Sequence, residues 1–303
     1  MDLKSYLREK KEIVDAALER YVPSHSALTG EGSFSTTLHK AVRHSLFAGG
    51  KRVRPILCMA AFEAAGGQGE GILPFACGLE MIHTYSLIHD DLPAIDNDDY
   101  RRGKPTCHKV YGEAIAILAG DALLTEAFQL MTKPLGGQSS VEAGLRFELV
   151  NEVARAAGVS GMVLGQVLDI ESEGREVDLP TLEYLHTHKT GKMILVSIKV
   201  GAKLGGAWGE GLEAFIRYGE RIGLAFQIAD DILNVEGKPE LLGKTTGSDR
   251  TKRKATYPGL LGLEESKRRA KELVAWAIEG LSRFGSEADP LREIARFIIA
   301  REY

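Results

Sequence analysis

Apolar residues recur along the chain at spacings of three and four, and this periodicity restricts the possible folds more than any other feature of the sequence. It runs from Leu3 and Leu7 near the beginning to Ala270 and Leu273 near the end. Such spacing places the apolar residues on one face of an α-helix, whereas a half-buried strand alternates apolar and polar residues. Because no stretch alternates in that way, the sequence predicts an all-α fold.

Gly, Pro and polar clusters divide this pattern into ten or more expected helices, which are joined mostly by short loops. The segments 75–93 and 207–236 are apolar on most faces, which is typical of helices in the middle of a bundle. No linker rich in Pro, Ser or charge interrupts the 303 residues, and we find no internal repeat of fixed period. We therefore expect one domain, residues 1–303, built as a helical bundle.

Charge and cysteine content limit the partners and the compartment. The 38 Lys and Arg against 42 Asp and Glu give a formal net charge of -4, whereas nucleic-acid binding needs a sustained basic surface. The three cysteines are odd in number and widely spaced, which fits the reducing cytosol. The N-terminal segment is unlike a signal peptide, and no uninterrupted apolar run reaches about 18 residues. We expect a cytoplasmic protein without a membrane span and without a nucleic-acid partner.

The first chemical signal is the acidic run HDDLPAIDNDD, residues 89–99, directly after an apolar segment. Asp90 and Asp96 are about 600° apart on an ideal helix and would not share a face. However, Pro93 lacks a backbone N–H and disturbs a helix, so the chain can bend and return Asp96 to Asp90. A solvated helix end is the alternative interpretation of such a run.

The second acidic cluster is QIADDILN, residues 227–234. Asp230 and Asn234 lie four residues apart on one face of an otherwise apolar helix. Unpaired buried charge is costly, so these side chains need a partner. Two such clusters facing each other would form an oxygen-rich site for a hard cation. Magnesium fits best, because it retains water and shares its coordination with the phosphates of a ligand.

Several basic segments are candidates for phosphate binding. GGKRVRP, residues 49–55, combines a glycine turn with three cations and a proline suited to the first turn of a helix. RRGKP, residues 101–105, follows the first acidic cluster at once. Further cations occur in HKTGKM and in the segment from Lys244 to Lys254, although exposed lysines are common. His83 lies two turns before Asp90, where a core histidine is the alternative.

Together these motifs resemble the trans-isoprenyl diphosphate synthases, and most closely the bacterial short-chain enzymes of the farnesyl diphosphate synthase type. The resemblance extends from about residue 38 to residue 303 and includes EMIHTYSLIHDDLPAIDNDDYRRGKPTCHKVYGE, GMVLGQVLDIESEG and KATYPGLLG. It implies an all-α fold around a deep central cavity, in which the two aspartate-rich motifs face each other. It also implies a homodimer.

The resemblance assigns a role to each motif. Asp90, Asp96 and Asp230 would bind Mg²⁺, with three ions in the ternary complex, and Asp91 and Asp231 would support them. The residues expected to hold the allylic diphosphate are Arg101, Lys189, Thr190, Gln227, Lys244 and Lys254. Those expected to bind isopentenyl diphosphate are Lys51, Arg54, His83 and Arg102. Most relatives carry a third aspartate where this chain has Asn234, so a metal contact of that side chain stays open.

The implied reaction is the magnesium-dependent head-to-tail condensation of isopentenyl diphosphate with dimethylallyl or geranyl diphosphate. Tyr85 and Ser86 lie five and four residues before Asp90, about one turn down the helix, where an aromatic ring would close the floor of the substrate tunnel. Because relatives that make longer chains tend to carry smaller side chains there, we expect farnesyl diphosphate. A geranylgeranyl or geranyl diphosphate synthase is the alternative.

Three other functions share some of these features. A type I terpene cyclase also uses aspartates and magnesium, but it usually has a Glu where this chain has Lys238. A His-Asp metal phosphohydrolase would use His44 and His89 with Asp90, but it leaves the second acidic cluster unexplained. A catalytically silent partner of another synthase is disfavoured because both acidic clusters and all the basic motifs are intact.

Overall fold

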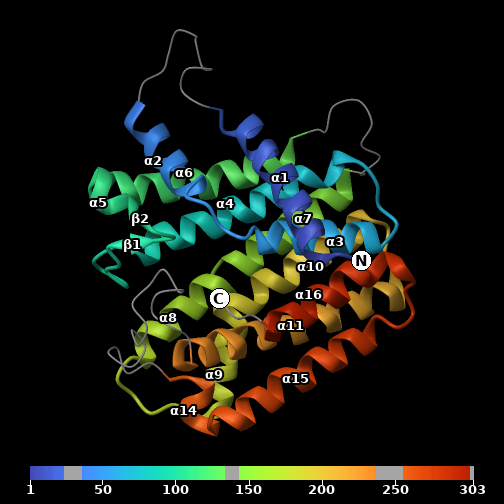
Figure 1. Ribbon diagram of the computed structural model, residues 1–303. Coiled ribbons are helices and arrows are strands. Elements are labelled where there is room, and N and C mark those ends of the chain that lie inside the picture. The colour runs from blue at the N-terminus through green and yellow to red at the C-terminus, as the bar shows by residue number, and fades with distance from the viewer. Residues whose placement is uncertain (24–35, 134–142, 237–254, 301–303) are drawn as a thin grey trace.

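The structure is a computed structural model that describes residues 1–23, 36–133, 143–236 and 255–300 (Figure 1). Most of these residues are helical and only two short strands are present among them, which confirms the predicted all-α fold. In chain order the α-helices are α1 (Leu3–Tyr21), α2 (Thr36–Leu46), α3 (Val53–Ala64), α4 (Leu73–Asp90), α5 (Cys107–Tyr111), α6 (Glu113–Thr132), α7 (Ala143–Ala157), α8 (Met162–Ser172), α9 (Leu179–His186), α10 (Lys192–Leu204), α11 (Gly209–Glu236), α14 (Tyr257–Leu261), α15 (Leu263–Gly280) and α16 (Asp289–Ala300). Short 3₁₀ helices precede α4 and α16, at Glu70–Ile72 and Ser286–Ala288.

One small hairpin departs from the expectation that no strand is present. Strands β1 (Tyr100–Arg101) and β2 (Lys104–Pro105) pair antiparallel. Arg102 and Gly103, which join them, have φ angles of 54° and 74°, and positive φ at both positions is typical of the tightest hairpin turns. Two residues per strand are too few to produce a visible alternation in the sequence.

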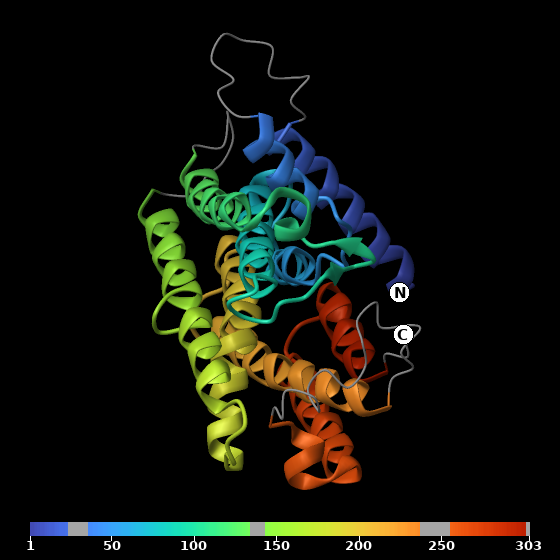
Figure 2. The same cartoon turned by 90° about the vertical axis from the view of Figure 1, so that its left-hand side faces the viewer.

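Two large apolar cores hold the bundle together, and a third, smaller cluster joins α9, α11, α14 and α15. The first lies mainly between α1, α2, α4 and α6, and the second between α3, α10, α11, α15 and α16. Figure 2 shows the first group in the upper half of the molecule and α11, α15 and α16 in the lower half, with α7 and α8 along one side. The C-terminal parts of α4 and α11, which carry the acidic motifs, come from different cores and meet at the site described below.

Three helical segments are long and apolar enough to cross a membrane, judged by length and composition alone. They are Glu70–Asp90, Glu113–Thr132 and Ala143–Ser172, and the most apolar window of each is 78%, 39% and 33% buried within the protein. The central position of α4 in the bundle accounts for the first. The absence of a membrane span, expected from the lack of a long uninterrupted apolar run, stays a prediction.

Candidate active site

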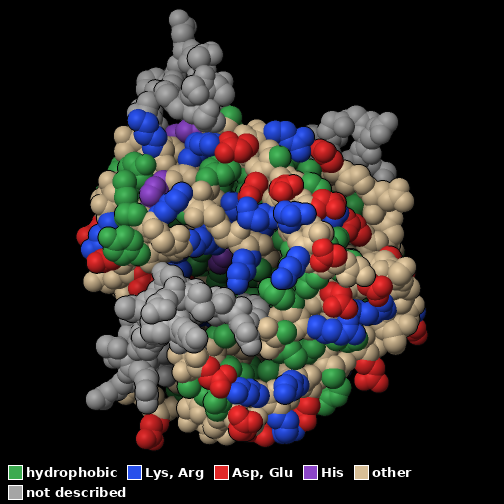
Figure 3. Space-filling view, in the orientation of Figure 1, with side chains coloured by type: hydrophobic (Ala, Val, Ile, Leu, Met, Phe, Trp, Pro, Cys, Tyr) green, Lys and Arg blue, Asp and Glu red, His purple; other side chains and the backbone are tan. Residues whose placement is uncertain are grey.

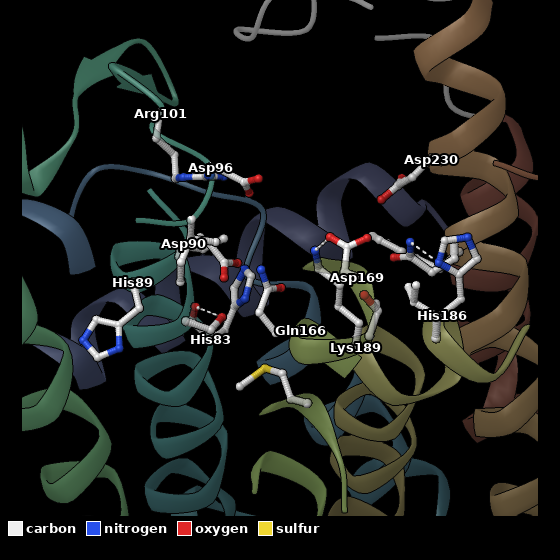
Figure 4. Close-up of a pocket in the computed structure, with 18 of the residues that line it drawn as sticks. His83, His89, Asp90, Asp96, Arg101, Gln166, Asp169, His186, Lys189 and Asp230 are labelled. Atoms are coloured by element: carbon white, nitrogen blue, oxygen red, sulfur yellow. Dashed lines mark hydrogen bonds and ion pairs between the residues drawn. The ribbon is translucent and has the colours of Figure 1, made fainter. Parts of the chain in front are cut away.

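A cavity of about 890 Å³ opens between α4 on one wall and α8 and α11 on the other (Figure 4). Its lining includes most side chains that the sequence analysis selected: Lys51, Arg54, His83, Tyr85, Ser86, Asp90, Asp96, Arg101, Arg102, Lys189, Thr190, Gln227, Asp230, Asp231 and Asn234. Asp91 lies just below the wall and is buried. Lys244 and Lys254 lie outside the described residues.

The chain turns back on itself after the first acidic motif begins. Helix α4 ends at Asp90, three residues before Pro93. The backbone N–H of Asp96 then donates to the backbone carbonyl of Asp90 at 2.8 Å, and Asn97 has a φ of 53°. The return of Asp96 to Asp90, predicted from the proline, is therefore observed, although the helix ends there instead of kinking.

Burial makes the charge of Asp90 costly. Burial, together with the nearby carboxylates of Asp96 and Asp91, raises the pKa of this carboxyl from 3.8 to about 6, although Lys189 and Arg101 oppose the rise. The positive charges of Lys189 and Arg101 therefore do not fully offset the cost of burying the Asp90 carboxylate beside two other carboxylates. A divalent cation at this point would favour the ionised form.

Asp91 does not line the cavity itself, but it forms an ion pair with Arg101, which does. Arg101 Nε donates to both carboxylate oxygens of Asp91, at 2.6 and 2.8 Å, and Arg101 Nη2 lies 3.3 Å from Asp98 Oδ2. The Asp91 side chain is buried, so this charged pair is held in one geometry. Asp91 thus fixes the position of Arg101, which itself lines the cavity.

The two aspartates of the second motif point in different directions. Asp230 lines the cavity opposite Asp90 and Asp96 (Figure 4). Asp231 is buried, and its Oδ2 accepts a hydrogen bond from the backbone N–H of Tyr257 at 2.9 Å and lies 3.2 Å from His186 Nε2. Asp231 therefore anchors α11 to α9 and α14, whereas Asp230 faces the opposite wall.

The three cations of the segment from 51 to 54 have separate tasks. Arg52 is buried with a φ of 51°, and it donates to Asp15 on α1, to Glu80 on α4 and to the Leu46 carbonyl, each at 2.8 Å. This network fixes the loop. Lys51 is exposed at the mouth, and Arg54 faces the cavity. Among the described residues, Arg54 Nε is buried without a hydrogen-bond partner, as expected of a group that awaits an anion.

His83 lies within a cluster of arginines. Burial lowers its pKa well below the usual value of 6.5, and the charges of Arg54, Arg102 and Arg101 lower the pKa further. The imidazole is therefore neutral, and the positive charge around it comes from guanidinium groups. Figure 3 shows Lys and Arg side chains gathered around the hollow on this face. The arrangement suits a polyanion such as a diphosphate.

Sequence reasoning assigned no role to several polar side chains that line the cavity, among them Arg52, Glu80, Gln166, Asp169 and His186. Glu80 and Asp169 did carry a signal, because each is a single carboxylate within an apolar run, CGLEMI and GQVLDI. A carboxylate in such a run must have a partner once the helix is buried. The partners, Arg52 and Lys189, are distant in sequence and become visible only in the fold.

The donors of the cavity fit magnesium that is shared with a ligand. Within the described ranges, no three His, Cys, Asp or Glu side chains converge closely enough to hold a metal ion by themselves. Mg²⁺ is usually bound by one or two carboxylates together with substrate phosphates and water. Asp90 and Asp96 on one wall and Asp230 on the other provide such partial sets, with a gap between them for phosphate oxygens.

Comparison with known proteins decides the family. The Polyprenyl synthetase family model matches residues 35–289. The chain belongs to the polyprenyl synthetase family. Among similar members, the farnesyl diphosphate synthase of Geobacillus stearothermophilus is 47% identical over 307 residues, covering 100% of this chain and 99% of that protein. The geranylgeranyl diphosphate synthase of Cyanophora paradoxa is 48% identical, covering 99% of this chain and 97% of that protein.

Solved structures of family members have the same fold. The geranylgeranyl pyrophosphate synthetase of Pyrococcus horikoshii matches with a TM-score of 0.87 at 28% identity, over 99% of both chains. An FPP/GFPP synthase of Zymomonas mobilis matches with a TM-score of 0.84 at 37% identity, over 98% of this chain and 99% of that one. The resemblance and the predicted class of enzyme, a prenyltransferase, are thus confirmed, and the cyclase and phosphohydrolase alternatives lose their support.

Proposed function

We propose that this family member condenses isopentenyl diphosphate with dimethylallyl and then geranyl diphosphate to give farnesyl diphosphate and inorganic diphosphate. The observation that carries the proposal is that two different sets of charged side chains line one cavity. One set combines carboxylates from both walls with Arg101 and Lys189, and the other consists of Lys51, Arg54 and Arg102 around His83. A cavity of this kind has room for two diphosphates with their hydrocarbon tails between apolar walls.

The allylic diphosphate would lie between Asp90 and Asp96 on α4 and its loop and Asp230 on α11. Asp90, Asp96 and Asp230 would hold the Mg²⁺, which would supply positive charge as the allylic carbon–oxygen bond breaks. Arg101 and Lys189 line the same region. Because Arg101 is fixed by Asp91, its charge is already in place when negative charge develops on the departing diphosphate. Thr190 and Gln227 would complete this site.

Isopentenyl diphosphate would bind to the second group, which consists of Lys51, Arg54, His83 and Arg102. The buried Nε of Arg54 would gain a phosphate oxygen as its partner. The neutral imidazole of His83 would donate a hydrogen bond without adding to the repulsion among the arginines. Binding both substrates in one cavity removes most of the entropy cost of bringing the alkene to the allylic cation.

The fifteen-carbon product is inferred from the wall beneath Asp90. Tyr85 is 7% exposed and lines the cavity, and its ring meets that of His89 edge-on with 5.6 Å between centroids. His89 Nε2 lies 3.0 Å from the Ile117 carbonyl of α6. A ring held in this way would block further lengthening of the prenyl tail of the product. The geranylgeranyl alternative remains a candidate because relatives of equal similarity include a protein of that name.

We also propose that the protein acts in the cytoplasm as a homodimer built from single-domain subunits. Large apolar side chains lie exposed on neighbouring helices of one side, including Ile117 and Leu118 on α6 and Phe147 on α7, which are 43%, 52% and 69% exposed. Burying them against a second copy would remove this surface from water. The three cysteines are buried free thiols, as is usual in a reducing compartment.

The test is to incubate the purified protein with isopentenyl and dimethylallyl diphosphates and Mg²⁺, and to identify the alcohols after dephosphorylation. We expect farnesol to predominate and no product to form when isopentenyl diphosphate is omitted or when EDTA is present. A cyclic hydrocarbon from the allylic substrate alone would instead indicate a cyclase. Formation of no product from any combination would support the silent-partner alternative.

A further inference from the structure

One carboxylate of the cavity belongs to neither aspartate-rich motif. Asp169 lies on α8, and its Oδ2 is 2.6 Å from Lys189 Nζ (Figure 4). The two side chains are 12% and 25% exposed, so solvent screens this ion pair less than it screens a surface pair. The pair also occupies the centre of the cavity, between the wall that carries Asp90 and the wall that carries Asp230.

Helix α8 contacts the backbone of Lys189 as well as its side chain. Lys189 lies in a π-helical turn, Thr187–Gly191, between α9 and α10. Gly165 of α8 packs against this turn, where a Cβ would lie only 2.1 Å from the backbone nitrogen of Lys189 and 2.4 Å from its Cα. Gly165 and Asp169 are four residues apart and thus share one face of α8. That face therefore holds Lys189 at two points.

The ion pair with Asp169 fixes the position of the Lys189 ammonium group. A lysine side chain is long and flexible, and its ammonium group has three donors. With one donor engaged by Asp169, the other two remain for a ligand. Lys189 lines the same cavity as Asp90 and Asp230, so its ammonium group lies in the space that the two acidic motifs border.

We propose that Asp169 is a positioning residue for the allylic diphosphate. It holds the ammonium group of Lys189 at the point where that group meets the diphosphate between the two acidic motifs, and it acts through Lys189 and not as a metal ligand or a base. The proposal rests on the proposed function, in which Lys189 binds this substrate. Ordering Lys189 in advance lowers the entropy lost when the substrate binds.

The primary test uses Asp169→Asn, which removes the charge and keeps the shape of the side chain. We expect the KM for dimethylallyl diphosphate to rise about tenfold, and that for isopentenyl diphosphate to change less than about twofold. Glu171→Gln is the matched control, because it removes the same charge from an exposed position on α8. Equal increases in both KM values for Asp169→Asn, or no increase in either, would overturn the proposal.

A double-mutant cycle tests the route through Lys189. Asp169→Asn should have almost no further effect in a Lys189→Ala background, whereas an equal loss in both backgrounds would contradict the positioning role. If Asp169→Asn does not show the native melting transition, Asp169→Glu takes its place, with the same expected difference between the two KM values. Failure of the proposed function is separate, since the native enzyme itself would then form no prenyl product.

Discussion

The backbone N–H of Asp96 donates to the backbone carbonyl of Asp90 at 2.8 Å, so that two aspartates six residues apart are brought together at the end of α4. The turn between them follows the helix end directly, and Asn97 completes it with a positive φ. The first acidic motif is thus a bend of the backbone that hydrogen bonds within residues 90–97 hold.

Removal of the Asp90 carboxylate should impair catalysis without unfolding the protein. We expect Asp90→Asn to lower kcat by at least ~100-fold, because it removes a charge that helps to place the metal ions at the departing diphosphate. Asp99→Asn is the matched control, since Asp99 lies in the same run but pairs with Lys109 at 2.7 Å outside the cavity. Steady-state kinetics with both variants checks this, and equal losses would refute it.

The same substitution should stabilise the metal-free protein near neutral pH. The pKa of Asp90 in the folded state is about 6, above its ordinary value of 3.8, so folding favours the protonated form, and this carboxyl lowers the stability as the pH rises from about 4 to about 6, with the full loss present above pH 6. Asn imitates the protonated form. At pH 7.5 in EDTA we expect Asp90→Asn to raise Tm by roughly 3 °C or more. This advantage should shrink as the pH falls from about 6 to about 4. A lower Tm at pH 7.5 would contradict the burial of an unbalanced charge.

Tyr85→Ala should lengthen the product. Removing the ring that meets His89 opens space below Asp90, so further isopentenyl units can add before release. We expect twenty-carbon or longer alcohols on chromatography of the dephosphorylated products. Trp208→Ala, which removes an aromatic ring that is 64% exposed and outside the cavity, is the control. An unchanged fifteen-carbon product from Tyr85→Ala would show that another residue limits chain length.

The buried network around Arg52 should contribute to stability. Glu80 and Arg52 are each 1% exposed, so Glu80→Ala leaves a buried guanidinium with one partner fewer. We expect a loss of about 3 kcal/mol in the free energy of unfolding, measured by urea denaturation. The exposed pair of Arg20 and Glu70 provides the comparison, since Glu70→Ala should cost less than about 1 kcal/mol. Similar losses in the two variants would show that the Arg52 network adds no special stability.

Much of the fold could be predicted from the sequence, because the helices carry their own periodicity and many of their ends lie beside a Gly or Pro. The central place of α4 followed from its apolar faces. The hairpin at 100–105 was missed, because its two-residue strands are too short to show alternation, and its turn depends on a positive φ at Arg102.

The site was predictable only as far as its motifs are local. A bend joins Asp90 and Asp96, and Pro93 predicts this bend in the sequence. The sequence did not show that Arg52 is buried in a structural network while Lys51 and Arg54 line the cavity. The partners of Arg52 in that network, Asp15 and Glu80, come from other helices. Asp169 was missed for the same reason. Its partner Lys189 follows twenty residues later, and the two meet only when α8 packs on the π-helical turn.

The most direct test of the central claim is the anomalous scattering of Mn²⁺ in crystals grown with a non-reactive thiolo analogue of an allylic diphosphate. We predict peaks at about 2.1 Å from carboxylate oxygens of Asp90 and Asp96 on one wall and of Asp230 on the other, with the diphosphate between them. A diphosphate bound only to Lys51 and Arg54, or metal peaks away from all three aspartates, would contradict the account.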